Sequence, residues 1–291
     1  MPTTYSPLRY PGGKSQLAKY VSHVLDLNGC TRNTAYCEAF CGGAGIAIKL
    51  LEDKRVGEII LNDYDIAIYS VWKAILEEPQ RFNEKIKKTL LNIEEWEKQR
   101  EAYLQLRDAN TYNFDLAWAT FYLNRTNRSG IIEGGPIGGK LQRGNYNLGC
   151  RFNRNALMRK VEKISTLKNR IKLYNLDGLD FIWNIIRSMR AETFFFFDPP
   201  YFKQGKNLYK NSLNEQYHMD LAKAIQNLVD KHWIVTYDDV PSIRKVYSGC
   251  DGWRYAIRYS ANLKRRQEEL IFKSKVTKIE SYGSVELCRL P

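Results

Sequence analysis

The chain has 291 residues and a hydrophobic content of 44%, enough to bury a sizeable core in one large domain or in one domain with an inserted module. Lysine and arginine number 45 against 32 aspartates and glutamates, and the net charge of +13 favours a polyanionic partner such as a nucleic acid. The apolar runs are too short to cross a membrane, and the first residues lack the layout of a secretory signal. We therefore expect a cytoplasmic protein with no membrane partner.

The cysteine and histidine patterns argue against two kinds of site. The six cysteines are scattered without a C-x-x-C pair, and none of the three histidines lies near a cysteine pair. A disulfide framework would need paired cysteines, and a zinc site would need clustered ligands. We expect a reduced chain with no metal site. The three histidines offer few candidates for a general base.

The first 75 residues alternate short apolar strands with helical stretches. Residues 36–40 are predicted to form a strand and 46–51 a helix, with the turn Cys41-Gly42-Gly43-Ala44-Gly45 between them. Residues 58–63 have the pattern of a second strand, which ends in an acid. A strand, a glycine turn, a helix and a strand in this order predict a βαβ unit.

Residues 76–165 differ from the first 75 residues in charge and in hydrophobic pattern. The segment 77–106 is long, charged and helical in pattern, and 116–123 predicts another helix. The glycine- and asparagine-rich stretch that follows, up to residue 147, suits a loop or a β-hairpin. Basic residues in and after this stretch are candidate nucleic-acid contacts: Arg125, Arg128, Lys140, Arg143, Arg151 and Arg154.

The alternation of strands and helices resumes after residue 166. Strands are predicted over 170–176, 193–197 and 233–237, with a helix over 218–231. Residues 253–259 and 268–273 suggest two antiparallel strands at the end of the chain. An α/β core of residues 1–75 and 166–291 is therefore interrupted by a basic, mainly helical insert of residues 76–165.

A first candidate site lies at the glycine turn. Glycines there let the backbone approach a ligand, and Asp63, at the end of the next strand, can accept hydrogen bonds from two ribose hydroxyls. Together they suggest a nucleoside cofactor. The dinucleotide fingerprint is not met, because the sixth position from Gly43 is Ile48, and no Gly-Lys-Ser/Thr follows for a P-loop. A tight strand–helix turn without a ligand is the alternative.

A second candidate site is Phe194-Phe195-Phe196-Phe197-Asp198-Pro199-Pro200-Tyr201-Phe202, where an apolar strand ends in an acid, two prolines and an aromatic ring. The prolines remove two backbone donors, so carbonyls there can face a ligand. Asp198 and such a carbonyl can accept the two N–H bonds of an exocyclic amine, which favours a more nucleophilic nitrogen. Tyr201 can stack on a base. A rigid turn after a strand is the alternative.

A third candidate is Leu8-Arg9-Tyr10-Pro11-Gly12-Gly13-Lys14 near the start of the chain. A glycine pair between an aromatic residue and a lysine, opening a helix, can pack against a cofactor. Lys14 can face a carboxylate or a carbonyl. A capped helix start is the alternative.

The order RYPGGK, EAFCGGAG, LNDYD, basic insert and FFFFDPPYF resembles the Dam-type family of DNA adenine-N6 methyltransferases over nearly the whole chain. LNRTNRSG, the glycine-rich segment and CRFNR resemble its target-recognition segment, and VTYDD and EELIF its later core strands. The resemblance implies a Rossmann-like methyltransferase core with a mixed seven-stranded sheet, formed by 1–75 and 166–291. It also implies an inserted, mainly helical DNA-recognition domain with a β-hairpin, over 76–165.

The resemblance also implies roles for individual residues. Tyr10 and Lys14 would flank the methionine part of S-adenosylmethionine and the active-site face. Asp177 would lie near the cofactor adenine, where the family often has an aromatic residue beside the acid and this chain has Gly178. The cofactor loop and ribose contact would be Phe40, Gly42, Gly45 and Asp63, and the target base would be held by Asp198, Pro199, Pro200 and Tyr201. The implied DNA contacts are Arg125, Asn127, Arg128, Lys140, Arg143, Arg151 and Arg154.

The implied reaction is direct transfer of a methyl group from S-adenosylmethionine to N6 of an adenine flipped out of double-stranded DNA, with no covalent enzyme intermediate and no metal. Lys264-Arg265-Arg266 suits a further phosphate contact or a solvated turn. The enzyme is expected to act as a monomer. The alternatives are methylation of cytosine N4 or of an RNA adenine, and an inactive nucleic-acid-binding protein that kept the fold.

Overall fold

The computed structural model describes residues 5–9, 14–190, 192–201, 215–258 and 266–291. Tyr10, Lys264 and Arg265 lie outside the described residues. The chain divides into two compact units, neither of which is one continuous stretch. The first unit comprises residues 1–13, 42–45 and 63–175, and the second comprises 14–41, 46–62 and 176–291.

The second unit is built on a mixed sheet. Its parallel strands are β1 (Ala35–Glu38), β2 (Glu58–Asn62), β4 (Thr193–Phe197) and β5 (His232–Asp238). Antiparallel partners follow in β6 (Gly252–Arg258), β7 (Arg266–Lys273) and β8 (Cys288–Arg289), and the strand order is β2-β1-β4-β5-β7-β6-β8.

The sheet has eight strands, one more than the seven expected, and β3 (Ile171–Tyr174) is the strand expected over 170–176. The strand that the sequence did not reveal is β8, whose two residues are too few to show a period. All five residues of β4 are buried, as expected for a central parallel strand covered on both faces. Its carboxyl end therefore delivers Asp198 to the edge of the sheet.

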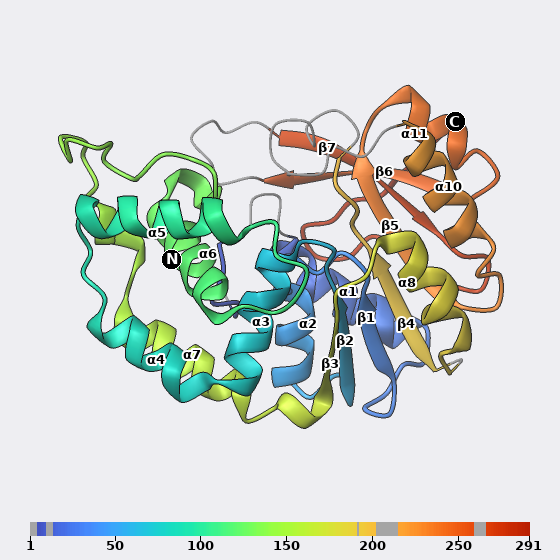
Figure 1. Ribbon diagram of the computed structural model, residues 1–291. Coiled ribbons are helices and arrows are strands. Elements are labelled where there is room, and N and C mark those ends of the chain that lie inside the picture. Colours follow the sequence, from blue (N-terminus) through green and yellow to red (C-terminus); the bar gives the residue numbers. More distant parts are fainter. Residues whose placement is uncertain (1–4, 10–13, 191, 202–214, 259–265) are drawn as a thin grey trace. The chain divides into compact units, whose positions relative to one another are not determined.

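The helices of the second unit alternate with its strands along the chain. They are η1 (Ser15–Leu17), α1 (Ala18–Leu27), α2 (Gly45–Glu52, with Gly45 in the first unit), α8 (Gly178–Asn184), η5 (Ile186–Ser188), α10 (Glu215–Gln226) and α11 (Pro241–Val246). Figure 1 shows α8 and α10 packed side by side next to β4 and β5.

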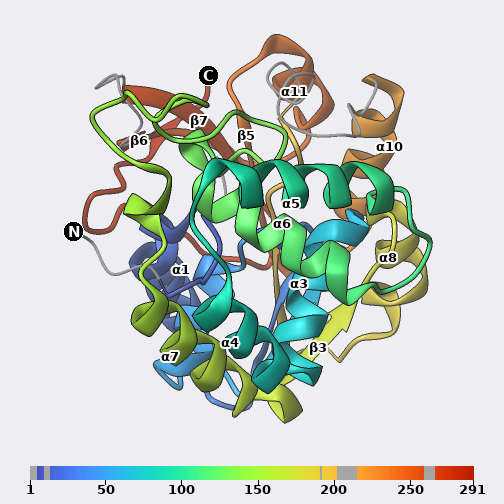
Figure 2. The same cartoon turned by 60° about the vertical axis from the view of Figure 1, so that its left-hand side comes forward.

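The first unit is mainly helical. Its elements are α3 (Ile66–Glu77), α4 (Pro79–Lys88), α5 (Ile93–Leu106), α6 (Phe114–Thr126), η2 (Arg128–Gly130), η3 (Leu148–Arg151), α7 (Arg154–Ser165), η4 (Lys168–Arg170) and β3. Helix α6 is buried almost all round, because α3 and α5 both pack on it, while α4 pairs with α7 (Figure 2).

Two sequence-based expectations in this unit need correction. The single helix expected over 77–106 is two helices, because Asn92 accepts a hydrogen bond from the Glu95 N–H at 2.8 Å and so caps a new start at α5. The expected β-hairpin is absent from residues 127–150, which contain only one isolated bridge, between Asn127 and Pro136. Positive φ angles at Gly138, Gly139 and Gln142 turn the backbone too often for paired strands.

The limits expected for the insert can be compared with the elements. The expected boundary after residue 75 falls inside α3, while the boundary after residue 165 coincides with the end of α7. Helix α3 packs on α6 and α7, so it belongs with them in the first unit. A target-recognition role for residues 76–165 stays a prediction. In the described part of the chain, no helix is both long and apolar enough to span a membrane.

Candidate functional site

Lys14, Asp198 and Tyr201, which the sequence singled out in two separate motifs, meet in the second unit. Asp198 follows β4, and its side chain is 19% exposed. The Lys14 ammonium lies 3.1 Å from Asp198 Oδ1, with only 2% of the Lys14 side chain exposed. Thr236 on β5 donates a hydrogen bond to the same Oδ1 at 2.7 Å. The carboxylate is thus fixed from two sides, with one edge open to solvent.

Tyr201 is held through its hydroxyl group. The Lys14 ammonium donates to the Tyr201 hydroxyl oxygen at 2.5 Å and lies 4.7 Å from the centroid of the ring. The same hydroxyl donates a short hydrogen bond to Glu269. Between Asp198 and Tyr201, Pro199 is buried and Pro200 is half-buried. With its hydroxyl fixed at both hydrogen-bonding positions, the half-buried ring of Tyr201 has little freedom to turn.

Glu269 is a member of this cluster that the sequence analysis did not identify. It lies in β7 with a fully buried side chain, accepts a hydrogen bond from the Tyr255 hydroxyl at 2.6 Å, and has Lys14 Nζ at 3.5 Å. Tyr255 is its direct cross-strand partner in β6, which explains why the two side chains meet. The signal in the sequence is an acid inside the apolar strand EELIF, since buried acids are rare unless paired.

One lysine therefore serves two carboxylates. Burial raises the pKa of Asp198 above its ordinary value, the Lys14 charge opposes that rise, and the Glu269 charge adds to it. The hydrogen bonds from Thr236 and Lys14 favour the ionised form of Asp198. The balance gives a carboxylate that is a better proton and hydrogen-bond acceptor than a solvent-exposed aspartate.

The glycine turn and Asp63 are linked within the first unit. The Gly42 N–H donates to Asp63 Oδ2 at 2.7 Å, and the Asp65 N–H donates to Oδ1 at 3.0 Å. Gly42 has φ 44°, a region that favours glycine, and the Trp72 indole N–H binds its carbonyl at 2.8 Å. Asp63 is thereby fixed in one orientation next to backbone that carries no side chain, an arrangement suited to ribose hydroxyls.

Phe40 and Asp177 are linked within the second unit. A Cβ at Gly178 would lie 2.6 Å from Cζ of Phe40, so the absence of a side chain there lets the Phe40 ring pack on the backbone. Asp177 caps α8 by accepting from the Leu179 N–H at 2.8 Å, and it accepts from the Tyr217 hydroxyl at 2.9 Å. These contacts place an aromatic ring and a carboxylate side by side. Tyr217 was missed because only the packing of α10 on α8 brings it there.

Two buried polar residues support these loops. The Asn62 amide donates to the carbonyls of Ala39 and Leu176 at 3.0 Å each, so it joins the segments that lead to Phe40 and Asp177. Glu38 accepts from the Ala47 N–H at 3.0 Å, near the start of α2. Burial raises the pKa of Glu38 to about 8.

The basic residues predicted to contact DNA fall into two groups. Arg128, Lys140 and Arg143 are exposed, and Lys140 pairs with Glu97 at 2.9 Å. The guanidinium groups of Arg125 and Arg154 are bonded to backbone carbonyls, and Arg154 donates to those of Ile86 and Thr89. Arg125 and the half-buried Arg151 are linked, since Arg125 donates to the Arg151 carbonyl.

Asn127 is the one predicted DNA contact that is completely buried. Its side chain accepts from the Trp96 indole N–H at 2.7 Å and donates to the carbonyls of Ile131 and Ile132. These bonds occupy the amide in shaping the turn that follows α6. Asn127 therefore shapes this turn, and its contact with DNA stays a prediction.

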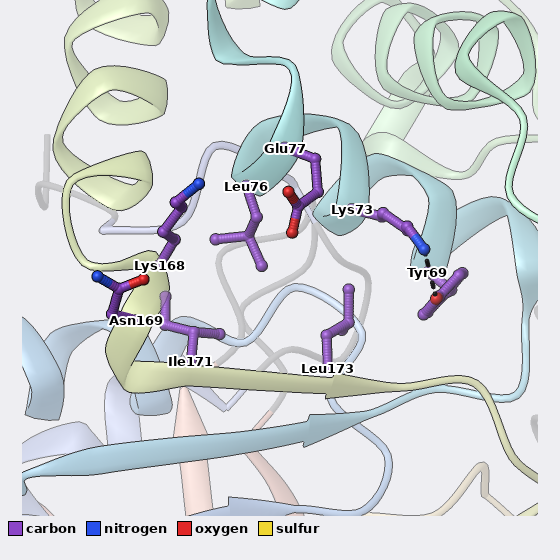
Figure 3. Close-up of a pocket in the computed structure, with 8 residues that line it drawn as sticks. All are labelled: Tyr69, Lys73, Leu76, Glu77, Lys168, Asn169, Ile171 and Leu173. Carbon is purple, nitrogen blue, oxygen red and sulfur yellow. Dashed lines mark hydrogen bonds between the residues drawn. The ribbon is translucent and has the colours of Figure 1, made fainter.

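A cavity of about 310 Å³ lies elsewhere in the first unit, between α3, η4 and β3 (Figure 3). None of the predicted site residues lines it. Lys73 points to the Tyr69 hydroxyl, 3.4 Å away, while Lys168 lies on the opposite side of the cavity. Among the described residues, no group of three or more His, Cys, Asp and Glu side chains could hold a metal ion.

Comparisons with known proteins give one family. A family model described as D12 class N6 adenine-specific DNA methyltransferase matches residues 10–266, most of the chain. No curated protein matches. Among solved structures, the rRNA methyltransferase AviRa from Streptomyces viridochromogenes is similar with a TM-score of 0.41 and 11% identity, over 92% of this chain and 86% of that one. A putative class I S-adenosylmethionine-dependent methyltransferase from Listeria monocytogenes has a TM-score of 0.37 and 10% identity, over 93% and 63%. At these scores only the family match carries weight.

Proposed function

The chain belongs to the D12 class of N6 adenine-specific DNA methyltransferases, and on this premise we propose that Lys14, Asp198 and Tyr201 hold the adenine that is methylated. The enzyme transfers a methyl group from S-adenosylmethionine to adenine N6 in DNA. The family match does not favour the alternatives of cytosine N4, an RNA adenine or an inactive protein. The observation that carries the proposal is the contact of one buried ammonium with both Asp198 and the Tyr201 hydroxyl.

The chemistry required of the protein is to prepare a weak nucleophile. The lone pair of adenine N6 is delocalised into the ring, and a carboxylate that accepts an N6–H hydrogen bond returns electron density to the nitrogen. Asp198, with its raised pKa, is suited to this bond and to receiving the proton that N6 loses when the new N–C bond forms. When bound, S-adenosylmethionine supplies the methyl group, so no covalent enzyme intermediate is needed. The remaining work is orientation.

Tyr201 is proposed to stack on the flipped adenine. A stacking ring contributes most when its orientation is fixed before the base arrives, because no rotational freedom is then lost on binding. Lys14 and Glu269 fix the Tyr201 hydroxyl, and Tyr255 in turn fixes Glu269. Glu269 is thus a positioning residue for the target base, and Pro199 and Pro200 hold Asp198 and Tyr201 at a constant separation.

For the cofactor we propose two sets of contacts, one in each unit. In the first unit, Asp63 would bind the ribose hydroxyls beside Gly42 and Gly45. In the second unit, Phe40 and Asp177 would contact the adenine moiety of the cofactor, and Asn62 and Tyr217 would hold them in place. Phe40 and Asp177 fit an adenine because the packed Phe40 offers a ring and the fixed Asp177 offers an acceptor.

For DNA we propose that the exposed residues Arg128, Lys140 and Arg143 contact the duplex around the flipped adenine. Their charges would favour contacts with the DNA phosphates, which set the register of the enzyme on the duplex, and a subset of the three side chains would read base edges. The enzyme is proposed to act as a monomer, and the cytoplasmic location expected from the sequence remains part of the proposal.

Transfer of a labelled methyl group to an adenine-containing duplex tests the proposed site. Wild-type enzyme is expected to form N6-methyladenine, and Asp198→Asn is expected to abolish transfer while binding S-adenosylmethionine with near-normal affinity in calorimetry. The matched control is Asp53→Asn, which changes a half-exposed aspartate paired with Lys49. Near-normal transfer by Asp198→Asn would refute the role of Asp198.

A further inference from the structure

Thr236 carries a buried hydroxyl group, and strand pairing sets its place beside Asp198. The strands β4 and β5 are parallel neighbours with Phe197 opposite Val235, so the residues that follow, Asp198 and Thr236, come side by side. Thr236 is fully buried in β5, and its hydroxyl donates to Asp198 Oδ1 at 2.7 Å. The register of two central strands therefore determines this contact.

A threonine at this position calls for a reason, because valine has nearly the same shape and no polar atom to bury. The preceding residues of β5, Ile234 and Val235, are apolar and fully buried. Burying a hydroxyl among such residues is unfavourable unless it is hydrogen-bonded. In the described part of the chain, the one hydrogen-bonding partner of the Thr236 hydroxyl is Asp198. The hydroxyl therefore serves that carboxylate.

The two oxygens of Asp198 are not equivalent. Oδ1 accepts from Thr236 at 2.7 Å and lies 3.1 Å from Lys14 Nζ. Oδ2 has a single partner among the described residues, Lys14 Nζ at 3.3 Å. A carboxylate oxygen offers about two acceptor sites, so both sites of Oδ1 are occupied while Oδ2 keeps one. Because the side chain is also partly exposed, Oδ2 is the oxygen with acceptor capacity left for a ligand.

A proton added to Oδ2 would leave this arrangement intact. A protonated carboxyl group keeps one oxygen without hydrogen, and Oδ1 in that state can still accept from Thr236. A proton added to Oδ1 would compete with the Thr236 hydroxyl for the same lone pairs, and one of the existing bonds would have to break. The geometry thus favours Oδ2 as the atom that gains a proton.

We propose that Thr236 is a positioning residue, which holds Asp198 so that Oδ2 accepts the hydrogen bond from adenine N6 and then the proton of that bond. In this step the N6–methyl bond forms, the N6–H bond breaks and its proton moves to Oδ2, while the electron pair of the methyl–sulfur bond stays on sulfur. The inference rests on the role proposed for Asp198 and deepens it. Thr236 would prepare the base without contacting it.

The Thr236 hydrogen bond also affects the charge of Asp198. Burial raises the pKa of Asp198, and this hydrogen bond opposes that rise by favouring the ionised form. The other titratable groups that interact electrostatically with Asp198 are Lys14, Glu269, Glu38, Tyr36 and Tyr237. None of them is altered when Thr236 is replaced, so a shift in the titration of Asp198 reports the loss of the hydroxyl.

Thr236→Val removes the hydroxyl and keeps the shape of the side chain. It is expected to lower kcat for methyl transfer about tenfold and to move the acidic limb of the kcat/KM profile to higher pH, with S-adenosylmethionine affinity unchanged in calorimetry. Thr236→Ser keeps a hydroxyl and is expected to restore both quantities. Thr120→Val is the matched control, since it removes a fully buried hydroxyl that has no hydrogen-bond partner among the described residues.

NMR titration of isotope-labelled aspartate carboxyl groups measures Asp198 without catalysis, and the loss of one signal in Asp198→Asn assigns it. The pKa of Asp198 is expected to be higher in Thr236→Val than in the wild type, and unchanged in Thr120→Val. Thr236→Cys, whose thiol is a weak donor, is expected to behave like Thr236→Val and replaces it if the valine variant does not fold.

A wild-type kcat and a wild-type acidic limb in folded Thr236→Val would overturn the inference, and so would a Thr236→Ser variant as impaired as Thr236→Val. These outcomes differ from failure of the proposed function. If Asp198→Asn transfers methyl groups normally, the role of Asp198 itself is wrong. If Asp198→Asn is inactive while Thr236→Val is normal, only the role of Thr236 is rejected.

Discussion

The Tyr201 hydroxyl and the Glu269 carboxylate are joined by a short hydrogen bond, in which the tyrosine donates. Glu269 is completely buried, and its other oxygen is bonded by Tyr255. Tyr201 comes from the segment that follows β4, and Glu269 from β7, so the bond ties the proposed target-base site to the antiparallel side of the sheet. A fully buried residue of β7 thus fixes the ring that would face the base.

Replacing Glu269 by alanine is expected to lower kcat for DNA methylation about ten- to a hundredfold, because the hydroxyls of Tyr201 and Tyr255 lose a charged acceptor worth about 1.5–3 kcal/mol. Cofactor affinity, measured by calorimetry, should change little. Tyr255→Phe is the matched control, since it removes one bond to Glu269 and leaves Tyr201 bonded, and its effect should be smaller.

The pH profile separates positioning from simple loss of structure. Transfer needs ionised Asp198, so kcat/KM rises with pH through the raised pKa of Asp198. Glu269→Gln removes a like charge and should move this acidic limb to lower pH, while Lys14→Met removes an opposite charge and should move it to higher pH. Shifts of both variants in the same direction would contradict the role given to Asp198.

Glu38 predicts a pH dependence of stability. Its pKa is raised to about 8 in the folded protein, so between its ordinary value and pH 8 the folded state holds a proton that the unfolded state has lost. The free energy of unfolding should therefore fall as pH rises through this window, by at most about 1.4 kcal/mol per pH unit from this group, and level off above it. Urea unfolding from pH 5 to 9 measures the slope.

Glu38→Gln should flatten that dependence, because glutamine is neutral at every pH and its amide oxygen can still accept from the Ala47 N–H. The control is Glu286→Gln, which removes a carboxylate from the exposed C-terminal segment. An unchanged slope in Glu38→Gln would show that the carboxyl group is ionised in the folded protein.

Gly178→Ala tests the packing proposed for the cofactor adenine. The added Cβ would lie 2.6 Å from Phe40 and 3.0 Å from the Tyr217 hydroxyl, so one of them must move, at a cost of about 1–3 kcal/mol. We expect a lower midpoint of thermal unfolding and weaker S-adenosylmethionine binding, with kcat preserved at saturating cofactor. Gly249→Ala, which has its nearest neighbour at 4.0 Å, is the control. Unchanged affinity in Gly178→Ala would remove Phe40 from the proposed cofactor contacts.

The sequence predicted those features that depend on short apolar runs. β4 was identified because four phenylalanines in a row can only be buried on both faces, and the acid after them marks the edge of the sheet. Glu269 was missed because its importance depends on the register of β6 and β7, which places Tyr255 opposite it. No local pattern encodes that pairing.

The basic insert was harder to interpret. Helix α6 is buried almost all round, so it shows no polar face from which the directions of its side chains could be inferred. The exposed Arg128 and the buried Asn127 are neighbours in the sequence, and only the turn after α6 separates their environments. The composition therefore shows that this segment is basic. Which of its basic side chains are exposed to solvent depends on the packing.

The arrangement of the central strands affects how the protein is made. β1 pairs with β4, and nearly all of the first unit lies between them in the chain. On the ribosome, β1 and β2 emerge long before β4, and a contact of such high sequence separation forms slowly. The exposed apolar edge of β1 must be shielded while the intervening helices are synthesised and fold. A nascent chain stalled before residue 193 is thus the form of this protein most in need of a chaperone.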